Sequence, residues 1–145
     1  MKNNKPLSIS VIVPTMNCIG EISEHIQALN KWIVQVNEVI VIDSESSDGT
    51  IESLKEGLTH PNITFINHPP GLYQSWNRAV KGATSKYVYF ATVSDKIMFP
   101  TLEKLYQTAE SSSADTVLSA PNIVSPSGKK LNKKWPIHRF IESRG

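Results

Sequence analysis

The sequence has a single cysteine, Cys18, among its 145 residues, so neither an intrachain disulfide nor a four-cysteine zinc site can form. Its four histidines show no metal-ligand spacing, and no apolar run approaches the roughly 18 residues that a membrane span needs. No apolar segment follows the first lysines, so we expect no signal peptide and a cytoplasmic location. With 39% hydrophobic and 19% charged residues, the composition excludes a disordered chain and favours a folded domain.

Charge is small overall and uneven along the chain. The formal charge of +2 at pH 7 is too low to indicate a nucleic-acid partner, and we expect none. Residues 129–145 hold six basic residues and one acid, a sum of +5, so residues 1–128 sum to −3. We therefore expect a domain at residues 1–120 and a basic tail at 121–145. Two interpretations of the tail stay open, namely peripheral contact with an anionic membrane and an exposed linker.

Strands and helices are predicted to alternate. Runs of β-branched and aromatic residues predict strands at 8–13, 39–42, 63–66, 87–91 and 116–118. The predicted apolar helix faces are Ile22, Ile26, Leu29 and Ile33; Ile51, Leu54 and Leu58; Tyr73, Trp76, Val80 and Ala83; and Leu102, Leu105, Tyr106 and Ala109. This alternation predicts an α/β fold with a mostly parallel sheet and helices on both faces.

Polar loops follow the first, second and fourth predicted strands, at residues 14–17, 43–48 and 92–95. Ligands of such sheets bind where the carboxyl ends of the strands meet, so we expect the functional site there. The first loop has one glycine, Gly20, and not the three of a dinucleotide site, and Gly128-Lys129-Lys130 is no phosphate-binding loop. Pro14 and Thr15 stand where a phosphoacceptor domain would carry acids.

Two strand-end carboxylates remain as candidates, Asp43 and Asp95. The first could accept a hydrogen bond from the imide N–H of uracil or from a ribose hydroxyl. The second could hold a divalent cation, since Mg²⁺ often takes one or two carboxylates and completes its shell with substrate phosphates. From the residues alone, loop caps and ligand contacts are both open for this pair. Asp48, followed by Gly49-Thr50, is interpreted as a helix cap, and Cys18 as a packed side chain.

Three stretches together resemble family 2 glycosyltransferases of the GT-A fold, across about residues 8–110. They are SVIVPTMN at 10–17, EVIVIDSESSDGT at 38–50 and GLYQSWNRAV at 71–80, the last leading through 83–88 into the fourth strand. The resemblance implies a Rossmann-like, nucleotide-sugar-binding GT-A sheet, here expected to be a truncated, donor-binding part. It also implies a transfer, with inversion, of a sugar from a nucleotide-diphospho-sugar, expected to be UDP-linked, to an unknown acceptor.

The resemblance also implies roles for residues at the strand ends. Pro14 and Thr15 would line the nucleotide pocket, Asp43 would bind the base, and Asn77 would lie under the pocket, either holding loops or touching the nucleotide. Ser94 and Asp95 would contact the nucleotide-sugar.

A divalent cation, Mg²⁺ or Mn²⁺, is implied at Asp95. Thr92 and Ser94 stand where the family carries the two acids of its Asp-x-Asp metal motif. Lys96, which follows Asp95, is either a partial substitute for the cation's charge or a solvated surface lysine.

Inverting transfer needs a general base to take the acceptor's proton, and no catalytic residue is assigned. In the family this carboxylate lies in the acceptor half, after the donor half, whereas the tail's single acid is Glu142 and nothing places it at a strand end. An alternative function therefore stays open: a catalytically incomplete module that binds a nucleotide-sugar without turnover.

Overall fold

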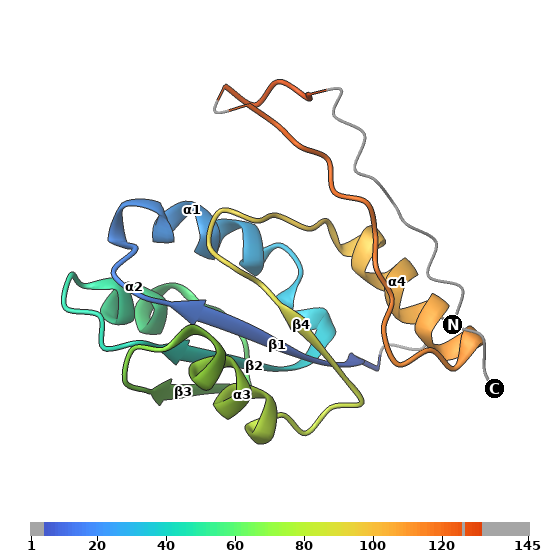
Figure 1. Cartoon of the computed structure of the whole chain (residues 1–145), viewed down its shortest axis with the longest axis horizontal. Coiled ribbons are helices and arrows are strands. Elements are labelled where there is room, and N and C mark those ends of the chain that lie inside the picture. The colour runs from blue at the N-terminus through green and yellow to red at the C-terminus, as the bar shows by residue number, and fades with distance from the viewer. Residues whose placement is uncertain (1–4, 126, 132–145) are drawn as a thin grey trace. The chain divides into compact units, whose positions relative to one another are not determined.

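The computed structural model describes residues 5–125 and 127–131 (Figure 1). The chain divides into two compact units, residues 1–103 and 104–145. Most of the predicted basic tail, from residue 132 on and including Glu142, lies outside the described residues. No helix in the described ranges has the length and apolar character needed to span a membrane.

Four parallel strands form the sheet of the first unit, in the order β3-β2-β1-β4. They are β1 (Leu7–Thr15), β2 (Val36–Asp43), β3 (Ile63–Asn67) and β4 (Tyr87–Phe90). The connecting helices are α1 (Ile19–Asn30), followed by the 3₁₀ turn η1 (Ile33–Gln35), then α2 (Thr50–Gly57) and α3 (Leu72–Gly82). The predicted α/β class and parallel sheet are confirmed.

Alternation along the strands buries both faces of the sheet. On one face, Ile12, Ile40 and Ile42 pack with Ala79 of α3. The opposite face carries Val11, Val13, Val39 and Val41, which are almost fully buried. The predicted stripe Ile22, Ile26, Leu29 and Ile33 is buried as well. The edge-on contact of Trp32, just after α1, with Tyr89 of β4 places α1 on that second face.

The predicted apolar face of α3 is partly wrong. The buried residues of this helix are Ser75 and Ala79, whereas Tyr73 is 73% exposed and Val80 40%. Small side chains let the helix axis approach the sheet closely, so the helix turns this narrow face inward. Of the predicted stripe, Trp76 stacks on Phe90 of β4, with ring centroids 4.4 Å apart.

Residues 116–118 do not form the predicted fifth strand. They follow α4 (Phe99–Ser112), where Pro100 sits in the first turn as predicted. Leu118 is 83% exposed, so the segment lacks the burial that stabilises a strand. Further along, an isolated antiparallel bridge joins Val124 to Lys130.

A buried carboxylate, Glu38, ties β2 to β1 and to the segment before β4. Its Oε1 accepts hydrogen bonds from the Ser10 hydroxyl at 2.5 Å, the Thr84 amide at 2.7 Å and the Thr84 hydroxyl at 2.8 Å. Burial opposes ionisation of Glu38, but these bonds outweigh it and hold the pKa below its ordinary value. The charged form therefore stabilises the fold.

We expect Glu38→Ala to lower the free energy of unfolding by about 2–3 kcal/mol in urea titrations at pH 7, because three donors lose a charged acceptor. A depressed pKa means that this stabilisation is present above the ordinary value of 4.5 and is lost as the pH falls through the lower folded-state value. The difference between wild type and variant should thus shrink in acid. Glu56→Gln, at an exposed position of α2, is the control; a difference that stays constant down to pH 3 would contradict the assignment.

Candidate functional site

The carboxyl ends of β1, β2 and β3 lie side by side in strict register. Thr15 is paired with Asp43, and Asp43 with Asn67. The Thr15 hydroxyl donates to Asp43 Oδ1 at 2.8 Å, and the Ser44 amide donates to the Thr15 carbonyl at 2.9 Å. The predicted site residues Thr15 and Asp43 are therefore brought into direct contact, with Pro14 next to them, paired with Ile42.

Asp43 is 3% exposed, and its carboxylate is held by donors from the end of β1 and from the loop after β2. Besides the Thr15 hydroxyl, Oδ1 accepts from the Ser46 hydroxyl at 2.6 Å, and Oδ2 accepts from the Ser46 amide at 2.8 Å. A carboxylate oxygen can accept about two hydrogen bonds. Oδ2, with one donor among the described residues, keeps capacity for a ligand.

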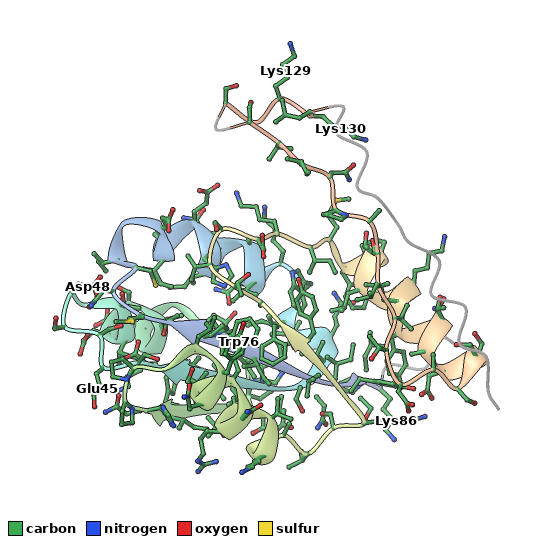
Figure 2. The ribbon with its side chains drawn as sticks, viewed as in Figure 1. Glu45, Asp48, Trp76, Lys86, Lys129 and Lys130 are labelled. Atoms are coloured by element: carbon green, nitrogen blue, oxygen red, sulfur yellow. The ribbon has the colours of Figure 1, made fainter. Side chains whose placement is uncertain are left out.

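Asp43 also lines an open cavity of about 500 Å³. The size lies within the range of small-molecule sites, roughly 300–1,000 Å³. Its apolar wall consists of Ile51, Phe65 and Ile66, and its other lining residues are Asp43, Glu45, Ser46, Glu52, Lys55 and Asn67. Figure 2 shows Glu45 at the end of the molecule to which β1 and β2 point. A flat ring could lie on the apolar wall with its polar edge toward Asp43.

Asn67 is a candidate that the sequence analysis missed. It is the last residue of β3, it is in register with Asp43 and it lines the same cavity. Its side-chain amide offers both a donor and an acceptor beside the carboxylate. A prediction could have found it by extending the third strand by one residue and aligning the parallel strand ends.

The loops after β1 and β2 are locked together by side chain to backbone bonds. The Asn17 amide donates to the Ser46 hydroxyl at 2.8 Å, and the Ser47 amide donates to Asn17 Oδ1 at 2.9 Å. Asn17 and Glu45 adopt positive φ angles of 44° and 56°. These cross-links hold both residues in conformations that side chains rarely adopt, and so fix the rim of the cavity.

Asp48 is structural, as predicted. Its Oδ2 accepts from the Ile19 amide at 2.9 Å, and its Oδ1 from the Thr50 hydroxyl at 2.7 Å and the Thr50 amide at 3.1 Å. Ile19 and Thr50 are the first residues of α1 and α2, where amides lack partners within the helix. The hydrogen bond from the Thr50 hydroxyl is the largest cause that lowers the pKa of Asp48.

The predicted residues after β4 lie apart from Asp43. The Thr92 hydroxyl donates a hydrogen bond to the Asp95 carboxylate, and the Asp95 backbone amide donates one to the Thr92 carbonyl. Ser94, between them, has a φ of 79°. Asp95 lines a second, small cavity together with His25, Trp32 and Tyr89, on the α1 face of the sheet. Asp43 and Asp95 therefore line two separate cavities, whereas we expected the three strand-end loops to form one site. The loop turns toward α1, where Lys96 pairs with Glu24.

Two titratable groups lie beside Asp95, the buried His25 and the half-buried Tyr89. Burial lowers the pKa of His25, whose Nε2 finds no hydrogen-bond partner among the described residues. Burial, with a smaller contribution from the Asp95 charge, raises the pKa of Tyr89 to about 12. Both side chains are therefore neutral at pH 7. The remaining predicted residue, Asn77, is exposed on α3.

The sequence model of the family described as "Glycosyl transferase family 2" matches residues 10–144. The chain belongs to this family. The matched range takes in the strand ends that carry Thr15, Asp43 and Asn67 as well as the segment after β4.

Curated relatives of this family 2 chain are named as glycosyltransferases. Glycosyltransferase GlyG of Streptococcus pneumoniae is 26% identical over 113 residues, 76% of this chain and 38% of the relative. TuaG of Bacillus subtilis, a glycosyltransferase named for teichuronic acid biosynthesis, is 26% identical over 136 residues, 92% of this chain and 54% of the relative. The chain thus spans between about a third and a half of these relatives.

Solved structures show the same GT-A fold. Staphylococcus aureus TarS residues 1–349 in complex with UDP has a TM-score of 0.58 at 27% identity, covering 74% of this chain and 33% of TarS. The TarS complex with UDP-GlcNAc has a TM-score of 0.57 at 28% identity, over 74% of this chain and 32% of TarS. Pyrobaculum calidifontis mannosyltransferase PcManGT, in complex with GDP-Man and Mn²⁺, shares the fold with a TM-score of 0.54 at 24% identity, over 86% of this chain and 37% of that protein.

The residues after β4 do not fit a divalent cation well. Within residues 5–125 and 127–131, no three His, Cys, Asp or Glu side chains converge, so a cation here would depend on Asp95 and the substrate phosphates alone. Thr92 and Ser94 offer neutral hydroxyls, and one Asp95 oxygen is already bonded by Thr92. Mg²⁺ and Mn²⁺ prefer anionic oxygen ligands.

Cys18 is half-buried beside Thr50, whose hydroxyl lies 3.8 Å from the sulfur. Burial is the largest cause that raises the pKa of this thiol, and the nearby Asp48 and Asp43 charges act in the same direction. A thiol with a raised pKa forms little of the reactive thiolate at neutral pH. The structure thus agrees with a packed side chain and not a nucleophile.

We expect the Cys18 thiol of the native protein to react with an aromatic disulfide reagent at pH 7.5 at least about tenfold more slowly than in the urea-unfolded chain. Because the chain has one cysteine, the released chromophore reports on this residue alone. The unfolded chain is the matched control. Equal or faster reaction of the native protein would show that the thiol is activated.

Proposed function

We propose that this family 2 chain binds a nucleotide-diphospho-sugar across the carboxyl ends of β2, β1 and β4. The donor is UDP-linked, and the reaction is transfer of its sugar with inversion to an acceptor. The binding of UDP and UDP-GlcNAc by TarS, similar over three quarters of this chain, supports the donor class.

One observation carries the proposal: the buried Asp43 carboxylate faces the cavity with unused acceptor capacity on Oδ2. The imide N3–H of uracil is a donor that matches it. A hydrogen bond to a charged acceptor contributes about 1.5–3 kcal/mol. Since Thr15 and Ser46 already hold the carboxylate, little conformational freedom is lost when the base binds.

The neighbours of Asp43 supply the rest of the base pocket. The Asn67 amide donates to a uracil carbonyl flanking N3, while Phe65 and Ile51 cover the ring. Pro14 and Thr15, which stand beside the cavity and do not line it, meet the nucleotide at the β1 end, largely through backbone. Asn77, exposed on α3, either holds loops near the pocket or touches the nucleotide.

Ser94 and Asp95 lie at the far end of an extended donor. Neighbouring strands are about 4.8 Å apart, so β4 lies roughly 10 Å from β2, with β1 between them. A donor with its base at Asp43 would carry its diphosphate over β1 and its sugar toward Ser94 and Asp95. Two separate cavities are compatible with one such ligand.

In the reaction, the acceptor hydroxyl attacks the anomeric carbon in line with the departing nucleoside diphosphate. The new carbon–oxygen bond forms as the bond to the diphosphate breaks, and the configuration inverts. Most of the protein's contribution is positioning of the donor and stabilisation of charge on the leaving group. The acceptor's proton goes to a general base, a role assigned to none of the described residues.

The second candidate is a nucleotide-sugar-binding module without turnover. The hydroxyls of Thr92 and Ser94 at the family's acidic positions favour it. It uses the same base pocket, so the two functions differ in chemistry and not in binding. Contact of the basic tail with an anionic membrane remains a prediction.

Base recognition predicts a preference between free nucleotides. We expect UDP to bind at least about tenfold more tightly than CDP or 3-methyl-UDP in calorimetry, because neither alternative has an N3–H donor for Asp43. Asp43→Asn should weaken UDP binding by about tenfold and narrow this preference.

Asp48→Asn is the matched control, because Asp48 holds the same loops without lining the cavity. Circular dichroism should show that both variants are folded. Equal affinity of the wild type for all three nucleotides would refute base recognition by Asp43.

Turnover separates the two candidate functions on one sample. We expect slow hydrolysis of UDP-sugar to UDP, since water can replace a missing acceptor in a donor site, and Asp43→Asn should lower its rate in proportion to occupancy. Coupled detection of released UDP measures it. Tight UDP binding with no release above the rate in buffer alone would favour the binding module.

A further inference from the structure

The donor's diphosphate needs a positive charge that the expected metal ligands do not supply. A nucleoside diphosphate gains negative charge as it leaves, and catalysis depends on stabilising that charge. At the end of β4, however, one carboxylate and two hydroxyls stand at the expected cation position. Another cationic group near the same strand end would solve the problem.

Lys96 is such a group. It follows Asp95 directly, lines the same small cavity, and its ammonium pairs with Glu24 of α1. Both side chains are well exposed, 54% for Lys96 and 73% for Glu24. The hydrogen bond and charge of Lys96 lower the pKa of Glu24, so this carboxylate is ionised at pH 7. Exposed ion pairs contribute little to stability, so Lys96 can exchange partners at small cost.

The surroundings hold the backbone of Lys96 in place while its side chain stays adaptable. Thr92 ties down Asp95, and the neutral His25, Trp32 and Tyr89 form the floor beneath. In Figure 1, the segment that follows β4 passes alongside α1, in agreement with the Lys96–Glu24 pair. The ammonium thus belongs to the segment after β4, the strand next to β1, over which the proposed donor carries its diphosphate.

We propose that Lys96 leaves Glu24 and pairs with the diphosphate of the donor, supplying the charge that a divalent cation would otherwise bring. Donor binding is then independent of metal. This inference rests on the proposed function and names the residue that holds the leaving group. Glu24 acts as a competing anion that occupies Lys96 until the donor arrives.

The test compares UDP with uridine, which lacks the phosphates, in calorimetry with EDTA and with Mn²⁺. We expect Lys96→Met to weaken UDP binding about tenfold, as for loss of one charged hydrogen bond, and to change uridine binding by less than about twofold. Glu24→Gln should leave UDP binding equal or tighter. Lys104→Met, at an exposed lysine of α4, is the matched control and should change neither.

Other results for UDP and uridine binding would contradict the inference. If Lys96→Met has no effect on UDP binding, or if Mn²⁺ tightens UDP binding tenfold or more in the wild type, the inference is wrong while the proposed function stands. If Lys96→Met weakens uridine as much as UDP, Lys96 acts on the fold and the inference is wrong. If the wild type binds neither ligand, the proposed function fails and the inference fails with it.

Discussion

The pairing of β1 with β2 places two buried carboxylates on the same strand, one at each end, and the rest of the structure depends on keeping both satisfied. Ser10 donates to Glu38 near the start of the strands, and Thr15 donates to Asp43 at their carboxyl ends. Both pairs are 28 residues apart, as one register requires. A slip by one residue would leave two buried charges without donors, a cost of several kcal/mol for each ion. Structural and functional demands thus select the same register.

At the functional end, the same arrangement makes the site rigid before any ligand binds. Asp43 is held by Thr15 and Ser46, and Asp48 joins the first turns of α1 and α2. Bonds between Asn17 and the residues Ser46 and Ser47 close the remaining gap between the two loops. A carboxylate fixed in this way can accept a hydrogen bond from a base in one direction. It therefore favours a base that places an imide N–H there over a base that places a lone pair there.

The sequence was sufficient for the strands of the sheet and for the buried stripe of α1, because continuous β-branched runs and a clean helical period leave one interpretation each. The sequence did not predict the buried face of α3, because apolar residues occur on two sides of this helix. Ser75 and Ala79 face the sheet because their small side chains let the helix approach it closely. The sequence also failed for residues 116–118, whose strand propensity has no burial behind it. Thr15 and Asp43 were predictable from strand ends, whereas Asn67 and the turn of Asp95 toward α1 depend on register and loop path.

The two ends of the proposed donor site differ in how firmly they are held, and this difference has a functional consequence. Around Asp43 the contacts are buried and cross-linked, whereas the segment 92–96 is held by exposed contacts, Thr92 with Asp95 and Lys96 with Glu24. A ligand anchored by its base can therefore reorganise the second end without disturbing the first, since exposed pairs exchange at little cost. Binding energy gained at the rigid end can then be used to position charge at the adaptable end, where the bond to the leaving group breaks.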